Sequence, residues 1–227
     1  MNIKRIGWIE TDFDSKFGIP RQSGLIDSLD GRIFFDKEYD IPEAFRGIEG
    51  FSHLWLIWEF SEAVRDSWSP TVRPPRLGGN TRMGVFATRS PFRPNALGLS
   101  CVRLKNVGYN VDGHRVVLAV TGADLMSGTP IIDIKPYLPL TDVRADALSG
   151  FAGEHEDYAL EVVIPNELLS LIPECKRNAL RAVLAHDPRP AYQNDPKRIY
   201  GFRFAGLEIK FTVSSGVLTV KSINNEQ

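Results

Sequence analysis

The residues between positions 70 and 100 hold the densest set of side chains in this sequence that could do chemistry. Arginines alternate there with prolines and glycines, most tightly in the run R-M-G-V-F-A-T-R-S-P-F-R-P-N at 82–95. Prolines and glycines fix the backbone, and a fixed loop is a good mount for polar groups. Such a loop could hold a carboxylate, a purine and phosphates together; a proline-stapled connection with its arginines in solvent is the alternative interpretation. The donors and aromatic faces are those of Phe86, Arg89, Phe92, Arg93 and Asn95.

The charge of the chain is balanced overall but unevenly distributed. The 227 residues include 27 Lys+Arg and 28 Asp+Glu. Residues 67–111 contain seven bases and no acid, whereas residues 141–171 contain seven acids and one base. The basic block implies a local positive field that would suit phosphate or nucleic acid, although a solvated arginine-rich loop would have the same composition.

Several functional classes find no support in the sequence. The glycine fingerprint of dinucleotide-binding folds and the P-loop motif are both absent. The four histidines and two cysteines have neither the spacing of a metal site nor the number for a disulfide framework. No apolar run approaches the ~20 residues of a membrane span, and the first residues lack the apolar core of a signal peptide. We therefore expect a cytoplasmic protein with no metal and no membrane partner.

The elements that must position the arginine-rich loop are mostly short strands. Runs rich in branched and aromatic residues, separated by glycine and proline, favour a closed or partly closed β-barrel over residues 1–141. An Asp-Gly pair at 112–113 predicts a hairpin turn between the last two runs. The expected strands are Ile3–Glu10, Arg32–Phe35, Phe51–Phe60, Ala96–Val107 and Arg115–Gly122.

A second unit is expected after the barrel. Residues 142–157 are acidic and rich in small residues, which is typical of a linker. Residues 158–227 then predict a small α+β domain, so that the fold class is mainly β with a C-terminal α+β domain. The elements predicted there are a strand at Tyr158–Ile164, one helix from Pro165 to about Ala185, and strands at Tyr200–Phe204, Leu207–Val213 and Val217–Ile223.

Six motifs, in order along the chain, resemble the TsaA-like family. The match spans about residues 3–213 and has two departures from the family pattern: Ala96, directly after the third motif, and Ser127 in the fourth. The motifs are P-R-Q-S-G at 20–24, G-F-S-H-L-W at 50–55, the arginine-proline run at 82–95, S-G-T-P at 127–130, D-I-K-P-Y at 133–137 and A-H-D-P-R-P-A-Y at 185–192.

The resemblance implies a methyltransferase that binds S-adenosylmethionine on a β-barrel, which agrees with the missing glycine fingerprint. It further implies N6-methylation of the threonylcarbamoyl-adenosine just 3′ of the anticodon in tRNA, and a homodimer with the site near the subunit boundary. By position in the motifs, the expected cofactor-binding residues are Pro20, Arg21, Gln22, Ser61, Glu62, Arg89, Leu99, Ser127, Gly128, Thr129 and Pro130.

Chemistry on that substrate would need a proton acceptor and a basic surface. The acceptor N6 belongs to a weakly nucleophilic, urea-like N–H, so some group must take or polarise its proton. Asn95, Asp133 and Tyr137 are the catalytic candidates, and a turn-capping or arginine-pairing role for Asp133 stays open. The threonyl carboxylate and the phosphates of the anticodon loop call for basic side chains. The candidates for this substrate binding are Arg73, Arg76, Arg82, Arg93, Lys135 and Arg189.

Two other functions remain compatible with the sequence. A protein of the same fold could methylate a different nucleoside or a small molecule, or the barrel could be the scaffold of a non-catalytic RNA-binding module. The C-terminal unit could contact tRNA or a partner subunit, or it could be a stabilising appendage.

Overall fold

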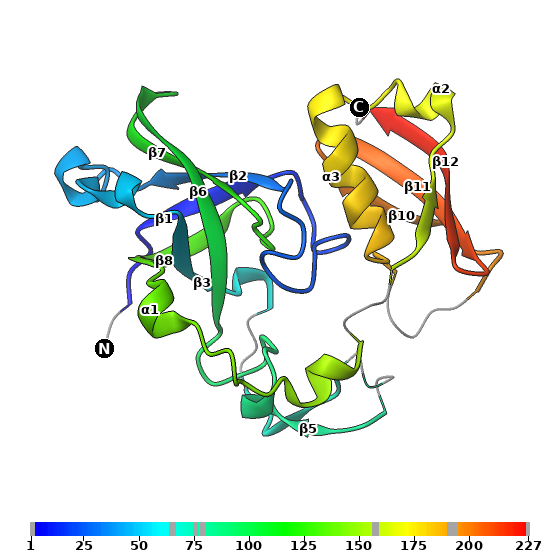
Figure 1. The fold of residues 1–227 in the computed structure, drawn as a ribbon, viewed down its shortest axis with the longest axis horizontal. Coiled ribbons are helices and arrows are strands. Elements are labelled where there is room, and N and C mark those ends of the chain that lie inside the picture. Colours follow the sequence, from blue (N-terminus) through cyan, green and yellow to red (C-terminus); the bar gives the residue numbers. More distant parts are fainter. Residues whose placement is uncertain are drawn as a thin grey trace.

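The structure, a computed structural model, contains a barrel and a smaller sheet domain (Figure 1). The β-barrel comes from the first part of the chain, and the α+β unit comes from the last. This confirms the fold class expected from the sequence. The residues described are 3–63, 67–74, 77, 80–155, 159–189 and 195–225.

The barrel is closed by six strands that pair in the order β1-β2-β7-β6-β3-β8. Every neighbouring pair is antiparallel. Closure removes the exposed strand edges that would otherwise invite pairing with another chain. The strands are β1 (Gly7–Thr11), β2 (Asp30–Phe35), β3 (His53–Glu59), β6 (Leu97–Val111), β7 (His114–Thr121) and β8 (Thr129–Pro136).

Strand β3 shows how the sequence pattern places side chains inside and outside the barrel. Leu54, Leu56 and Trp58 are buried, whereas the residues between them are partly exposed. This alternation follows from the period of two in a strand, so residues on the outward face of β3 are free to contact ligands or loops. The β6–β7 hairpin turns at Asp112 and Gly113, both with positive φ, as the Asp-Gly pair predicts.

Short elements fill the connections of the barrel. The arginine-rich loop connects β3 to β6, and a two-residue ladder between β4 and β5 closes part of it. The loop is therefore tied at both ends to adjacent barrel strands, which limits where its arginines can lie. The short elements are η1 (Pro42–Phe45), η2 (Ile48–Gly50), η3 (Ser61–Ala63), β4 (Thr71–Val72), β5 (Met83–Gly84), η5 (Val85–Ala87), α1 (Pro139–Asp142) and η6 (Gly150–His155).

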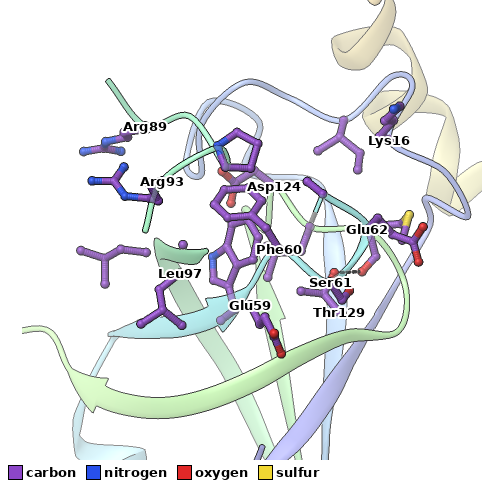
Figure 2. A pocket seen from close by; sticks show the side chains of 18 of the residues that line it. Lys16, Glu59, Phe60, Ser61, Glu62, Arg89, Arg93, Leu97, Asp124 and Thr129 are labelled. Carbon is purple, nitrogen blue, oxygen red and sulfur yellow. Dashed lines mark hydrogen bonds between the residues drawn. The ribbon is translucent and has the colours of Figure 1, made fainter. Parts of the chain in front are cut away.

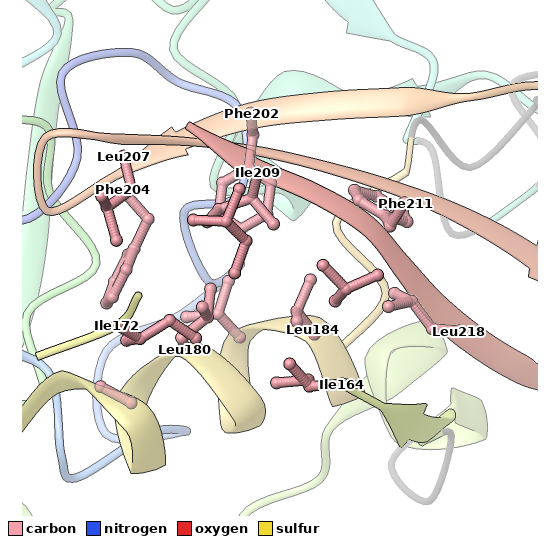
Figure 3. Close-up of a cluster of buried hydrophobic side chains, with 14 of the residues drawn as sticks. Ile164, Ile172, Leu180, Leu184, Phe202, Phe204, Leu207, Ile209, Phe211 and Leu218 are labelled. Atoms are coloured by element: carbon pink, nitrogen blue, oxygen red, sulfur yellow. The ribbon is translucent and has the colours of Figure 1, made fainter. Parts of the chain in front are cut away.

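The C-terminal unit is a four-stranded sheet in the order β10-β11-β12-β9, with helix α3 packed on one face (Figure 3). The helix contributes Leu180 and Leu184 to the core, opposite aromatic residues of the sheet such as Phe204 and Phe211. The elements are β9 (Glu161–Val163), α2 (Asn166–Leu169), α3 (Glu174–Ala185), β10 (Tyr200–Phe204), β11 (Leu207–Ser214) and β12 (Val217–Asn225).

The expectation of one helix from Pro165 to about Ala185 is wrong. Helix α2 ends at Leu169, and α3 begins at Glu174. Pro173 stands between them with an extended backbone, at φ −49° and ψ 134°. Proline lacks the N–H that an α-helix needs and its ring clashes with the preceding turn, so the helix restarts after it.

The hydrophobic core of the C-terminal unit includes residues from the connection between β1 and β2. Phe13, Ile26 and Leu29 are at most 4% exposed and pack in that core, and the ring of Phe13 meets the ring of Phe204 edge-on at 5.4 Å. Lys176 on α3 adds an ion pair, with Nζ at 2.6 Å from Asp12 Oδ2. The loop at residues 12–29 is thus shared between the two units.

We predict that Lys176→Met lowers the free energy of unfolding by about 2 kcal/mol. The two partners are only 21% and 13% exposed, so the variant leaves the Asp12 carboxylate poorly solvated and without its cation. The expected cost lies between that of an exposed pair, below ~1 kcal/mol, and that of a fully buried one, ~3–5 kcal/mol. Urea denaturation measures the difference.

Lys210→Met is the matched control. Its ion pair with Glu208 lies on one strand, with both side chains more than 40% exposed. We expect a change within about 0.5 kcal/mol. Equal effects of the two variants would show that the contact between α3 and the β1–β2 loop contributes no more than a surface pair.

Candidate functional site

A cavity of about 810 Å³ opens at the end of β3 (Figure 2). That volume lies within the range of ~300–1,000 Å³ typical of small-molecule sites. Segments that are far apart in the sequence meet around it, and all of its lining residues precede residue 130. The four lining segments are residues 16–22 of the β1–β2 loop, residues 58–63 at the end of β3, residues 88–99 of the arginine-rich loop and β6, and residues 124–129 before β8.

Two lining residues, Trp58 and Asp124, are connected by hydrogen bonds through the buried side chain of Ser100. The indole N–H of Trp58 donates to Ser100 Oγ at 3.0 Å, and the Ser100 hydroxyl donates to Asp124 Oδ1 at 2.6 Å. The Trp58 ring lies so close to Gly98 that a Cβ there would be 2.2 Å from a ring carbon. Glycine at position 98 is therefore required for the indole to lie flat against β6.

Among the carboxyl groups that line the cavity, Asp124 has a shifted pKa. Burial raises the pKa of its carboxyl above the ordinary value, although the Ser100 hydroxyl, backbone N–H groups and the Arg89 guanidinium oppose the shift. One of those N–H groups belongs to Ser23. The carboxyl thus interacts with groups of the arginine-rich loop, the β1–β2 loop and strand β6.

The two loops that carry the predicted cofactor residues also bind each other. The Arg89 guanidinium donates to the Gln22 side-chain oxygen. The neighbouring Ser23 hydroxyl accepts the backbone N–H of Cys101 on β6 at 3.0 Å. The P-R-Q-S-G segment is therefore held against the barrel on the same side as Arg89.

The arginine-rich loop is shaped by local hydrogen bonds. The hydroxyls of Thr88 and Ser90 accept the backbone N–H groups of Ser90 and Phe92, which are the turns that such residues commonly form. The guanidinium of Arg93 donates back to the Thr88 carbonyl at 3.1 Å. These bonds turn Arg89 and Arg93 toward one side of the cavity, as Figure 2 shows.

The structure brings most of the predicted cofactor residues to this one cavity. Ser127, Gly128 and Pro130 are not in the lining; the Ser127 N–H instead donates to the Phe13 carbonyl at 2.8 Å. Of the other predicted residues, Arg93 and Asn95 also line the cavity. The predicted cofactor residues in the lining are Pro20, Arg21, Gln22, Ser61, Glu62, Arg89, Leu99 and Thr129.

The other predicted catalytic residues lie outside the cavity lining: Asp133 is on β8, and Tyr137 follows directly after that strand. Asp133 pairs with Lys135 at 3.0 Å, and not with an arginine as the alternative role for this carboxylate had it. Tyr137 packs against the Trp55 ring at 5.6 Å between centroids. Their catalytic roles stay predictions.

The predicted substrate-binding arginines outside the cavity are spread over the chain. Arg73 and Arg82 are exposed near the β4–β5 ladder, and Arg82 donates to the Thr71 hydroxyl at 2.7 Å. Arg189 lies in the C-terminal unit, where its guanidinium pairs with Asp187 at 2.8 Å. Arg76 lies outside the described residues.

Sequence reasoning missed Asp124 and the aromatic wall formed by Trp58 and Phe60, whose rings meet edge-on at 4.2 Å. The available signal for Asp124 was its position between a strand and the S-G-T-P motif, three residues before Ser127. In the sequence, Trp58 and Phe60 look like core residues of a strand. Nothing there shows that β3 ends at a cavity, so no signal marked them as part of a site.

Two family models match the chain. The model described as the tRNA-methyltransferase O N-terminal domain matches residues 8–143, and the TrmO C-terminal domain matches residues 158–226. The chain belongs to the TrmO family. The resemblance that the sequence motifs indicate is thereby confirmed.

Relatives in the TrmO family match nearly the whole chain. A tRNA (adenine(37)-N6)-methyltransferase of Escherichia coli K12 is 44% identical over 196 residues, which are 84% of this chain and 83% of that protein. A putative S-adenosylmethionine-dependent methyltransferase, RcsF, of Pseudomonas aeruginosa is 39% identical, over 92% of this chain and 90% of that protein. A crystal structure of TrmO from P. aeruginosa superposes with a TM-score of 0.81 at 30% identity, covering 100% of this chain and 97% of that one.

Two further findings concern the described part of this TrmO-family chain. Within it, no group of three or more His, Cys, Asp or Glu side chains is placed to hold a metal ion. None of its helices is both long enough and apolar enough to cross a membrane.

We predict a specific pH dependence for Asp124→Asn. The folded protein keeps the Asp124 proton to a higher pH than the unfolded chain does, because burial raises the pKa. As the pH rises above about 3.9, the ordinary pKa of Asp, the wild type should therefore lose stability relative to the variant. Urea denaturation of both proteins between pH 4 and 7 measures the difference. A difference that instead shifts in favour of the wild type with rising pH would mean that hydrogen bonds and Arg89, not burial, dominate at this carboxyl.

Proposed function

We propose that this chain is an S-adenosylmethionine-dependent methyltransferase that modifies N6 of adenine 37 in tRNA, with the adenosine in its threonylcarbamoyl form. The observation that carries the proposal is the cavity at the end of β3, which is lined by residues of three family motifs: P-R-Q-S-G, the arginine-proline run and S-G-T-P. The names of the relatives support both halves of the proposal, the tRNA position and the cofactor.

The cavity lining fits this cofactor chemically. Arg21 and Arg89 suit the carboxylate of a methionyl group, because guanidinium binds carboxylate in a bidentate manner. The carboxylates Glu59 and Glu62 suit its ammonium group, and the rings of Phe60 and Phe92 offer faces to a purine. The mixture of donors, carboxylates and apolar walls is what a ligand with a zwitterionic end and a nucleoside end requires.

In this proposal the chain acts mainly by alignment. S-adenosylmethionine supplies, when bound, a methyl group carried on a sulfonium. Methyl transfer is an in-line displacement, so the contribution of Gln22, Arg89 and their neighbours is to hold two reactants in a productive orientation. Of the three predicted catalytic residues, Asn95 lines the cavity, and we assign its side-chain oxygen the role of polarising the N6 proton of the substrate.

We propose that the anticodon loop extends from the cavity along the outward face of β8. An anticodon loop is far larger than the cavity, and its unstacked bases and phosphates need aromatic and basic side chains. Asp133 and Lys135 follow Thr129 along this strand and Tyr137 comes directly after it, so the substrate would meet them next. The basic block at 67–111 supplies Arg93 in the cavity lining and two exposed arginines near the β4–β5 ladder, Arg73 and Arg82.

We also propose a cytoplasmic homodimer. Residues 138–148 contain several large apolar side chains that are exposed to solvent. Leu140 is 94% exposed and Leu148 is 97% exposed. Leu138 and Val143 add to this surface. Exposed apolar groups gathered in one segment indicate a surface that another molecule covers, and we assign a second copy of the chain to it.

Calorimetric titration with S-adenosylmethionine and S-adenosylhomocysteine, followed by methylation of tRNA with and without threonylcarbamoyl-adenosine, tests the function. We predict that Arg89→Ala weakens cofactor binding by about 10- to 100-fold, since charged hydrogen bonds contribute about 1.5–3 kcal/mol. Asn95→Ala should retain cofactor binding and lose methylation. Arg115→Ala removes an exposed arginine outside the cavity and should change neither measurement.

The outcomes separate the alternative functions. Cofactor binding without methylation of either tRNA would favour a methyltransferase for another nucleoside or a small molecule. No cofactor binding at millimolar concentration, with retained RNA binding, would favour a non-catalytic RNA-binding module. If Arg89→Ala or Asn95→Ala unfolds at a lower temperature than the wild type, the arginine-rich loop stabilises the fold and is not a binding site.

We predict that Leu140→Asp shifts the proposed dimer toward monomer in sedimentation equilibrium, because a charge would be buried against the second copy. Lys210→Asp also introduces an aspartate, but at a half-exposed position of the C-terminal sheet outside the proposed interface. It should leave the dimer intact. A wild-type chain that sediments as a monomer at all concentrations would contradict the proposal.

A further inference from the structure

The loop between β1 and β2 lacks regular structure of its own although it carries three predicted cofactor residues. It runs from residue 12 to residue 29 without a helix or strand and includes Pro20, Arg21 and Gln22. Loops of this length inside compact domains are uncommon and need packing or hydrogen bonds from elsewhere to take one conformation. What holds the loop therefore determines how often it is ready to bind.

The C-terminal unit holds both ends of this loop. At the first end, Asp12 accepts the Ala205 N–H with its carbonyl at 2.8 Å and pairs with Lys176 through its carboxylate. Phe13 follows, buried in the C-terminal core. At the second end, Ile26 and Leu29 are buried in the same core.

The middle of the loop also touches the C-terminal unit, two residues before Pro20. Gly18 has φ +83°, and a Cβ at this position would lie 2.3 Å from a ring carbon of Phe202 on β10. The backbone of the loop therefore rests directly on an aromatic ring. A larger residue would meet both an unfavourable backbone conformation and a clash.

The barrel contacts the loop as well. The Ser127 N–H donates to the Phe13 carbonyl at 2.8 Å, the Gly122 N–H donates to the Leu29 carbonyl at 2.9 Å, and the Arg89 guanidinium donates to Gln22. Ser23 bonds to Cys101 on β6, and the Gly24 N–H donates to the Gly122 carbonyl at 3.0 Å. Pro20, Arg21 and Gln22 thus span from a contact with the C-terminal unit to a contact with the barrel (Figure 1).

We propose that the C-terminal unit is the support that holds the P-R-Q segment in its binding conformation, so that cofactor affinity depends on Phe202 and Lys176 although neither lines the cavity. The inference rests on the proposed function, because it takes Pro20, Arg21 and Gln22 as cofactor-binding residues. Phe202 and Lys176 are positioning residues that act through the loop. When the loop is in place only part of the time, the measured affinity falls in proportion to that fraction.

The decisive variant is Gly18→Ala. We expect S-adenosylmethionine to bind about tenfold more weakly, which corresponds to about 1.4 kcal/mol, and amide hydrogen exchange of residues 19–24 to be faster in the ligand-free protein. The double variant Gly18→Ala/Phe202→Leu makes room for the added methyl group and should recover part of the affinity. The KM for tRNA at saturating cofactor should stay unchanged.

Gly216→Ala is the matched control. Gly216 also has a positive φ, +78°, but no atom lies within 4 Å of an added Cβ, and it sits in the β11–β12 turn. It should change neither affinity nor exchange at residues 19–24. If Gly18→Ala does not fold, Lys176→Met gives the same two measurements without a change in the loop sequence.

The results distinguish this inference from the proposed function. A wild-type protein that binds no cofactor would overturn the proposed function. Hydrogen exchange in the ligand-free protein would still show whether the C-terminal unit holds residues 19–24 in one conformation. Unchanged exchange at residues 19–24 in Gly18→Ala and Lys176→Met would overturn the inference. So would faster exchange with unchanged cofactor affinity, or a rise in the KM for tRNA alone, which would indicate an RNA-binding role for the C-terminal unit.

Discussion

A buried indole N–H must have a hydrogen-bond partner, and meeting that requirement organises the site. Trp58 is 9% exposed at the end of β3, and Ser100 on β6 is its partner. The Ser100 hydroxyl in turn donates to Asp124, which is close enough to Arg89 and Ser23 for both to affect its charge. One chain of interactions therefore begins in the barrel wall and reaches two of the loops that surround the cavity. The position of each loop depends on the same strand pairing that closes the barrel.

The distribution of charge follows from this arrangement. The basic block of the sequence forms one side of the cavity, and three carboxylates, Glu59, Glu62 and Asp124, line the cavity too. The carboxylates come from the end of β3 and from the loop before β8, which lie outside the basic block. A zwitterionic ligand would find both signs within one cavity, while the exposed arginines of the long loop still present a positive surface to a polyanion.

Local patterns predicted the local structure well. The strand expected at Phe51–Phe60 and the Asp-Gly turn of the β6–β7 hairpin depend on neighbouring residues only, and both are present in the structure. The family resemblance predicted a common site for Pro20, Ser61 and Arg89, and all three line the same cavity. Pro173 could have divided the predicted helix, because proline acts within a single turn.

What the sequence could not show depends on contacts between distant residues. Asp124 has no distinguishing pattern around it until β6 brings Ser100 beside it. The packing of Phe13 on Phe204 joins residues near opposite ends of the chain, and neither position carries a pattern that names the other. The core of the C-terminal unit therefore contains residues from both sides of the acidic connector, although the composition of the sequence changes at that connector.

The contact between Phe13 and Phe204 has a consequence for synthesis on the ribosome. All strands of the barrel emerge before residue 137, but β10 emerges only after residue 199. During that interval Phe13, Ile26 and Leu29 have no core to enter, and the first loop of the barrel is left in water. Closing so long a segment of chain is among the slower events of folding. A nascent chain could therefore have a complete barrel before it has a complete binding site, and the last strands to be translated finish the first loop that was made.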